Sequence, residues 1–179
     1  MVQTQIRYIT PYSADRNIGA AYNQAISELP DDCYIVIRDG DTMFLTPDWG
    51  RQIEQIIVAN PEYSVITCMT NRLGLPECLV DGVMNDADIA GQIETAYSRW
   101  NDFGTSVKLA KVAPGMLMIF HKSVWGRCKF RENSIIFDRE FSNSVLRSGG
   151  KIGIAQGFYI FHLYRYGMKK PQSYVSHLK

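Results

Sequence analysis

Residues 35–49 read IVIRDGDTMFLTPDW. The apolar run at the start of this segment reaches Arg38, and two aspartates, Asp39 and Asp41, follow with one glycine between them. An apolar run without alternation is typical of a strand buried on both faces, as in a parallel sheet that helices cover. Pro47 and Asp48 then introduce a helical pattern, because proline and acidic residues favour the first turn of a helix. The segment therefore predicts a buried strand, an acidic turn and a helix.

The acidic turn predicts a cation site. Side chains two residues apart in an extended strand lie on the same face, so Asp39 and Asp41 point the same way. Two carboxylates this close repel unless a cation lies between them or one is protonated. Ligands of open α/β sheets gather at the carboxyl ends of strands, and carboxylate oxygens suit Mg²⁺ or Mn²⁺. The alternative is a polar turn in which Arg38 neutralises one carboxylate.

The rest of the chain alternates between strand and helix patterns. We predict strands over residues 5–10, 33–38, 63–70, 106–113, 115–120 and 151–163, and helices over 17–29, 49–59, 87–100 and 138–149. Residues 71–87 are rich in Gly, Pro, Asn and Asp and are expected to form a long loop of functional interest. Alternation without repeats or an evident linker predicts one layered α/β domain spanning 1–179.

The composition of the chain bears on which partners it could bind. The chain has 179 residues, with 46% hydrophobic and 21% charged residues, as expected for a folded globular protein. Lys plus Arg number 19 and Asp plus Glu number 18, which gives a net charge of +1. Such a balance gives no support for nucleic acid or an anionic membrane as the main partner.

Cysteine spacing and hydropathy bear on the cellular location. The four cysteines are scattered and form no C-x-x-C pair, and the first ten residues do not resemble a signal peptide, so we expect a cytoplasmic protein. No stretch is long and apolar enough to be expected to span a bilayer. The basic tail MKKPQSYVSHLK (168–179) suggests at most weak contact with a membrane surface.

Several segments together resemble one enzyme family. NIGAAYNQAI (17–26) followed by YIVIRDGDTMFLTPDW (34–49) is similar to the core of GT-A fold glycosyltransferases of the family 2-like type. The segments APGMLMIFHKSVWGRCKF (113–130), FDREFSNSVLRSGGKIGI (137–154) and GFYIFHLYRYG (157–167) resemble that family's acceptor strand, catalytic segment and last strand. The matching order of these segments carries the resemblance.

The resemblance implies a fold and a reaction. The fold would be a three-layer, Rossmann-like α/β fold with a mixed, mainly parallel sheet and helices on both faces. Residues 1–70 would form the donor and metal half, and residues 71–179 the acceptor half and tail. The reaction would be transfer of a sugar from a nucleotide-diphosphate sugar to a carbohydrate or other hydroxyl acceptor, with inversion.

The resemblance also implies roles for individual residues. Asp39, Asp41 and His162 would bind Mn²⁺ or Mg²⁺, and Asp39 could instead bind the ribose of the donor. Asp138 would be the general base, with Glu140 two residues later as the other catalytic carboxylate, although Asp138 also suits a helix N-cap. Gly115 and Met116 would line the acceptor side. The remaining expected contacts with the nucleotide sugar are Pro11, Asp15, Arg16, Asn17 and Arg165.

Two other functions remain open. The family usually has a strand–helix–strand unit between its first strand and the Asn-Gly helix, whereas here residues 8–19 run almost directly from strand to helix. A degenerate domain that binds carbohydrate or a partner without catalysis is therefore one alternative. The other is a phosphatase similar to haloacid dehalogenases, in which Asp39 would be the nucleophile of a D-x-D-x-T motif.

Overall fold

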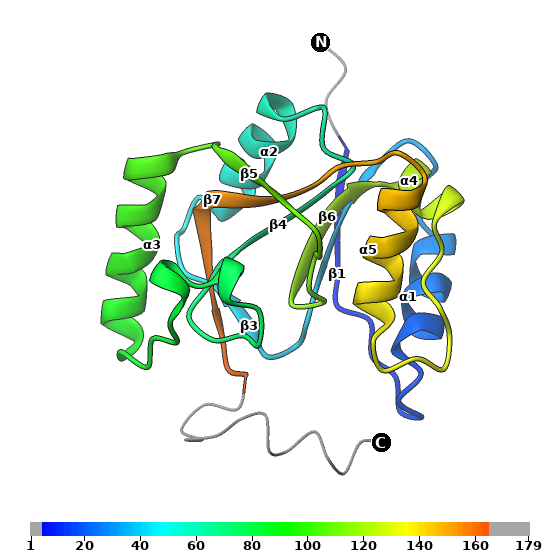
Figure 1. Cartoon of the computed structure of the whole chain (residues 1–179), viewed down its shortest axis with the longest axis horizontal. Coiled ribbons are helices and arrows are strands. Elements are labelled where there is room, and N and C mark those ends of the chain that lie inside the picture. Colours follow the sequence, from blue (N-terminus) through cyan, green and yellow to red (C-terminus); the bar gives the residue numbers. More distant parts are fainter. Residues whose placement is uncertain (1–4, 165–179) are drawn as a thin grey trace.

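The computed structural model describes residues 5–164 and shows an α/β fold (Figure 1). The seven strands of this region are β1 (Ile6–Ile9), β2 (Tyr34–Arg38), β3 (Thr42–Phe44), β4 (Val65–Thr70), β5 (Val107–Ala110), β6 (Leu117–His121) and β7 (Ile152–His162). The five α-helices are α1 (Ile18–Ser27), α2 (Trp49–Ala59), α3 (Ile89–Phe103), α4 (Lys122–Arg127) and α5 (Phe137–Arg147). Two short 3₁₀ turns, η1 (Pro76–Cys78) and η2 (Val80–Gly82), lie in the loop after β4.

The strands form a single mixed sheet. Its order is β1-β2-β6-β4-β7-β3, and β5 also pairs with β7. The pairs β1–β2 and β4–β7 are parallel, whereas β2–β6, β4–β6, β3–β7 and β5–β7 are antiparallel. The expectation of a mainly parallel sheet is therefore wrong for the strand pairings, because β6 runs antiparallel to both of its neighbours, and β3 and β5 run antiparallel to β7.

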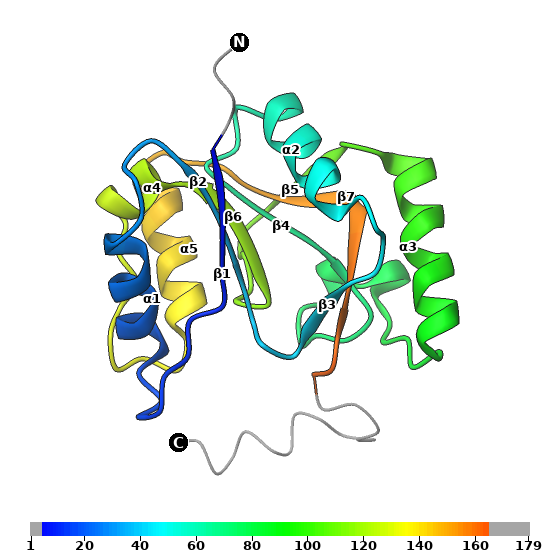
Figure 2. The same ribbon diagram turned by 180° about the vertical axis from the view of Figure 1, so that it is seen from behind.

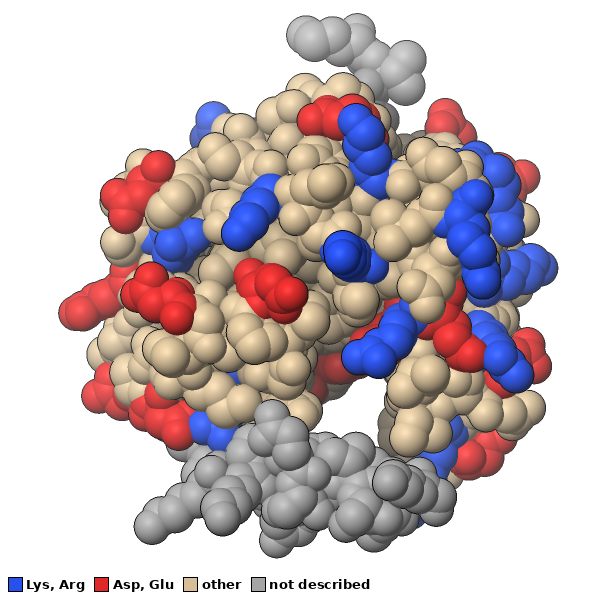
Figure 3. Space-filling model, viewed as in Figure 1, with Lys and Arg blue, Asp and Glu red and all other residues tan. Residues whose placement is uncertain are grey.

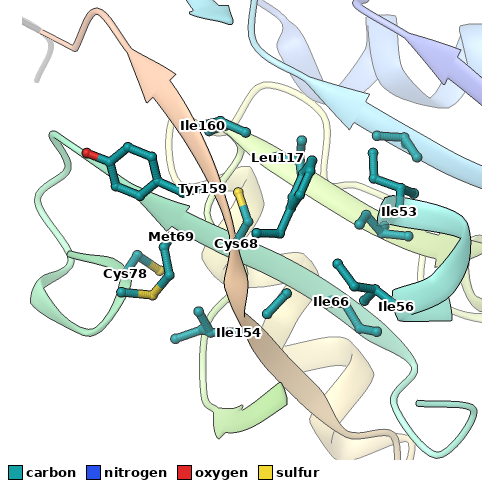
Figure 4. Packing of buried hydrophobic residues seen from close by; sticks show 14 of the residues in the cluster. Ile53, Ile56, Ile66, Cys68, Met69, Cys78, Leu117, Ile154, Tyr159 and Ile160 are labelled. Atoms are coloured by element: carbon teal, nitrogen blue, oxygen red, sulfur yellow. The ribbon is translucent and has the colours of Figure 1, made fainter. Parts of the chain in front are cut away.

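Helices cover both faces of the sheet, as expected. Alternate residues of β2 enter two different hydrophobic clusters: Val36 belongs to one, and Ile35 and Ile37 belong to the other. Helices α2 and α3 pack on the face of Val36, and α1, α4 and α5 pack on the opposite face. Figures 1 and 2 show α1, α4 and α5 grouped together and α3 at the far end of the sheet. Figure 4 shows Ile53 and Ile56 of α2 beside Ile66 of β4.

The predicted bounds of a helix agree well with the structure where the hydrophobic pattern of the sequence is long. Helix α2 has the predicted bounds, and α1 begins after Asn17, whose side chain accepts a hydrogen bond from the Ala20 amide as an N-cap. The predicted N-cap at Asp138 is wrong: Ile136 occupies the N-cap position of α5, and Asp138 lies inside the first turn. Strand β3 and helix α4 have no counterpart in the prediction.

The cysteines and the hydropathy of the helices can be compared with what the sequence predicts. All four cysteines are buried free thiols, as expected for small apolar side chains in a core. Among residues 5–164, no helix combines the length and hydropathy that crossing a membrane requires. Arg165 and the basic tail, to which the sequence assigned donor and membrane contacts, lie outside the described residues.

Candidate metal centre

Three side chains that are distant in the sequence meet at one edge of the sheet. Asp39 follows β2, Asp41 precedes β3, and His162 ends β7. Strand β3 pairs antiparallel with β7 so that Thr42 lies opposite His162, and the Leu163 amide donates to the Asp41 carbonyl at 2.9 Å. One ligand atom of each of the three residues lies within 4.8 Å of the others. The structure thus brings together the three residues that were expected to bind a metal.

The two carboxylates have different electrostatic surroundings. Burial raises the pKa of Asp39, and the neighbouring charge of Asp41 raises it further. The His162 ring, whose Nε2 lies 3.4 Å from Asp41 Oδ1, lowers the pKa of Asp41. A half-buried carboxylate beside a second one is a site at which a positive charge would be favoured.

The side chain of Asn71 and the backbone carbonyl of Arg72 orient His162. Its Nδ1 lies 3.0 Å from the carbonyl oxygen of Arg72, and its backbone amide donates to Oδ1 of Asn71 at 2.7 Å. A carbonyl can only accept, so Nδ1 donates to Arg72, and the other ring nitrogen, Nε2, faces Asp41. This arrangement is the usual way in which a protein fixes the tautomer of a metal-binding histidine.

Asn71 is a site residue that sequence reasoning missed. It is 1% exposed, and its Nδ2 has no hydrogen-bond partner among the described residues. The available signal was a polar residue directly after the apolar strand β4, at the start of a loop already expected to be functional.

Arg38 does not neutralise the aspartates. Its guanidinium donates to the carbonyl oxygen of Thr42 at 2.6 Å and lies over the ring of Phe44. Within the described part of the chain, Arg38 forms no ion pair with Asp39 or Asp41. The polar-turn alternative therefore lacks the contact on which it depends.

A third carboxylate, Asp138, lies close to this centre. Its Oδ2 accepts a hydrogen bond from the Gly115 amide at 3.3 Å, and burial raises its pKa. A Cβ atom built on Gly115 would lie 3.9 Å from Asp39 Oδ1, so Gly115 is close to both carboxylates. Met116 packs in the core with 1% exposure, and its carbonyl accepts from the Asp39 amide. Its side chain is therefore not on an open acceptor surface.

Glu140 does not join these residues. It lies in the same turn of α5 as Asp138, but its Oε1 pairs with Arg131 at 2.8 Å. It lines a separate polar pocket whose other residues are Lys129, Arg131, Asn143, Ser144 and Arg147. Figure 3 shows basic side chains concentrated on that side of the molecule. The structure places Glu140 outside the cluster of Asp39, Asp41 and His162.

Asp15 and Asn17, which were expected to contact the nucleotide, form hydrogen bonds with other residues of the protein. Asp15 accepts hydrogen bonds from the Ser13 hydroxyl and the Asn17 amide, which lower its pKa. Arg16 has a positive φ of 65°, and Asn17 both caps α1 and exchanges hydrogen bonds with Asn133. Through these contacts, Asp15 and Asn17 stabilise the connection between β1 and α1.

Pro11 lies in the same connection, near the acidic turn. The preceding residue, Thr10, has its methyl group 3.9 Å from the position of a Cβ on Gly40. The segment that contains Pro11 therefore starts beside Gly40, the residue between the two aspartates.

Comparison with known proteins adds no assignment. No protein-family model matches this sequence, and no curated protein is significantly similar to it.

Proposed function

We propose that this chain is a metal-dependent glycosyltransferase with a GT-A fold, similar to the family 2-like type. It would transfer a sugar from a nucleotide-diphosphate sugar to a hydroxyl acceptor. One observation carries the proposal: Asp39, Asp41 and His162 converge within 4.8 Å, in the arrangement that the order of the sequence motifs implies. The mixed sheet with helices on both faces is compatible with this fold.

The chemistry of the three ligands fits a divalent cation. Two carboxylates supply the charge and oxygen atoms that Mg²⁺ and Mn²⁺ prefer, and the imidazole nitrogen makes Mn²⁺ the first ion to test. When bound, such an ion neutralises the charge that develops on a leaving diphosphate. Asp41, which is half-exposed, and the lone pair of His162 Nε2 would face the ion directly.

Asp138 suits the role of general base. It is a half-buried carboxylate whose pKa is raised by burial, and it accepts a hydrogen bond from the Gly115 amide, near Asp39. The acceptor hydroxyl would transfer its proton to Asp138 while its oxygen forms a bond to the anomeric carbon. The bond from that carbon to the diphosphate oxygen would break, and its electron pair would leave with the diphosphate. Attack opposite the leaving group inverts the configuration.

A non-catalytic binding domain is the second candidate. It is favoured by the short connection between β1 and α1, which spans residues 10–17 and contains no helix or strand. A domain with so little structure at this position would have few groups to recognise a nucleotide base. Such a domain would bind carbohydrate or a partner without sugar transfer.

Thermal melting with nucleoside diphosphates, with and without Mn²⁺, separates these candidates. A catalytic domain should be stabilised only when both are present, by about 2.7 kcal/mol at a ligand concentration 100 times Kd. That corresponds to roughly 5–10 °C for a chain of this size. The Asp41→Ala variant should lose the shift. Asp32→Ala is the matched control, because Asp32 forms an exposed aspartate–histidine pair with His121 away from this centre.

A panel of nucleotide sugars with Mn²⁺ then tests for catalysis. We expect sugar release from at least one donor, abolished by Asp41→Ala and retained by Asp32→Ala. No melting shift and no turnover with any donor would favour the binding domain. Hydrolysis of a simple phosphate ester without sugar transfer would favour the phosphatase alternative.

A further inference from the structure

A buried tyrosine of α1 contacts the candidate metal centre. Tyr22 is 1% exposed, and its hydroxyl donates a hydrogen bond to Oδ1 of Asp39 at 3.2 Å. Because an ionised carboxylate only accepts hydrogen bonds, the tyrosine must be the donor. A phenol keeps its proton at neutral pH, so the hydroxyl can donate this hydrogen bond.

The ring of Tyr22 is held in place from two sides. It packs edge-on against Phe130 and Phe137, with ring centroids 5.2 Å and 5.3 Å away. Edge-to-face contacts of this kind fix both the position and the orientation of a ring. Phe137 immediately precedes Asp138 and lies 3.0 Å from the position of a Cβ on Gly115. The hydroxyl is therefore presented to Asp39 from a rigid aromatic cluster.

The hydrogen bond constrains the orientation of Asp39. A carboxylate has two oxygens, and the contact with Tyr22 occupies Oδ1, on the side of Gly115. The backbone of Asp39 is fixed independently, because its amide donates to the Met116 carbonyl at 3.1 Å. With the backbone and one oxygen both held, the second oxygen has a defined direction.

We propose that Tyr22 is a positioning residue: its hydroxyl holds Asp39 Oδ1 and thereby turns Oδ2 towards the cation site formed with Asp41 and His162. This inference rests on the metal-binding part of the proposed function and is independent of the donor and the acceptor. Outer-shell partners of this kind typically contribute a factor of 10–100 to metal affinity.

The structure supplies a matched control for a buried tyrosine hydroxyl. Tyr159 on β7 is 3% exposed, and its hydroxyl donates to Gln92 Oε1 at 2.6 Å on the other face of the sheet. Tyr159→Phe removes a buried hydroxyl and its hydrogen bond, as Tyr22→Phe does, but leaves Asp39 untouched. Any general effect of losing such a bond appears in both variants.

The test is Mn²⁺ affinity, measured by electron paramagnetic resonance of the free ion or by calorimetry, without substrate. We expect Tyr22→Phe to weaken Mn²⁺ binding by at least about tenfold. Tyr159→Phe should remain within twofold of the wild type. Both variants should melt cooperatively in the absence of metal, since each retains its ring.

The outcomes separate this inference from the proposed function. If the wild type binds Mn²⁺, Asp41→Ala abolishes binding, and Tyr22→Phe binds as tightly as the wild type, the role of Tyr22 is refuted while the metal centre stands. Equal weakening in Tyr22→Phe and Tyr159→Phe would also refute it. If the wild type binds Mn²⁺ no better than Asp41→Ala, both the metal centre and the role of Tyr22 are refuted.

Discussion

The amide of Gly115 donates a hydrogen bond to the carboxylate of Asp138, with 3.3 Å between nitrogen and Oδ2. Asp39 is also near this glycine, because its Oδ1 would lie 3.9 Å from a Cβ at this position. Gly115 thus lies close to two carboxylates with different proposed tasks. Ser142 secures the segment from α5, because its hydroxyl accepts a hydrogen bond from the Ala113 amide.

Gly115→Ala should impair turnover without unfolding the protein. The added Cβ would lie 3.0 Å from Cζ of Phe137, so the ring next to Asp138 must shift by a few tenths of an ångström. Because catalysis is sensitive to small displacements of a reacting group, we expect kcat to fall at least about tenfold. The control is Gly126→Ala in α4, where a Cβ meets no atom within 4 Å and should be neutral or slightly stabilising. Unchanged kcat in Gly115→Ala would contradict the proposed role of this glycine.

Asp138 and Glu140 should differ sharply in kinetic assays. The loss of a general base lowers kcat by roughly 10²–10⁴-fold, so Asp138→Asn should be nearly inactive. Glu140→Gln should retain turnover, because Glu140 pairs with Arg131 away from the metal ligands. Steady-state rates with the best donor measure both variants. Near-normal turnover in Asp138→Asn would leave this carboxylate with only a structural role.

Asp138→Asn should also stabilise the fold at neutral pH. Burial raises the pKa of Asp138 in the folded protein, so its ionisation costs stability as the pH rises through that pKa. Below the pKa of about 3.9 for an unfolded aspartate, the residue is protonated in both states and the cost disappears. We expect the variant to melt at a higher temperature than the wild type at pH 7, and no higher than the wild type below pH 4. Melting curves across this range give the result, and a gain that grows as the pH falls would have the wrong sign.

Asn71→Ala should weaken both the fold and the metal centre. The substitution leaves the buried amide of His162 without its acceptor, which typically costs about 1–3 kcal/mol. The melting midpoint should fall by several degrees, and the Mn²⁺ affinity should fall with it, because His162 loses part of its support. Asn143→Ala on the exposed side of α5 is the control and should change stability by less than about 0.5 kcal/mol. A variant at position 71 that melts like the wild type would contradict this account.

Long patterns predicted the elements of this fold, and short or long-range features escaped prediction. Helix α2 was predictable because Ile53, Ile56 and Ile57 recur on one face, and all three are buried. Strand β3 has only three residues and owes its existence to pairing with β7, more than a hundred residues later. Helix α4 follows β6 without a break, with His121 as its N-cap, so its sequence gives no sign that the strand has ended.

Local chemistry likewise limited prediction of the site. Asp39 and Asp41 could be predicted as metal ligands from local sequence, because two neighbouring carboxylates after an apolar strand repel each other unless a cation binds. His162 was predicted as a ligand only through the family resemblance. Tyr22 occupies an ordinary core position of an amphipathic helix, and its hydrogen bond to Asp39 depends on how α1 packs on the sheet. The direction of Glu140 depends on the register of α5, which begins one residue before the predicted start.

Strand β7 has a consequence for the order of biosynthesis. It is the partner of β3, β4 and β5, and it carries the histidine of the candidate metal centre at its last position. A ribosome therefore translates both aspartates more than a hundred codons before the residue that completes their cluster. A nascent chain cannot assemble this corner until almost all of the described sequence has left the exit tunnel, so a prematurely terminated product would lack the cluster altogether.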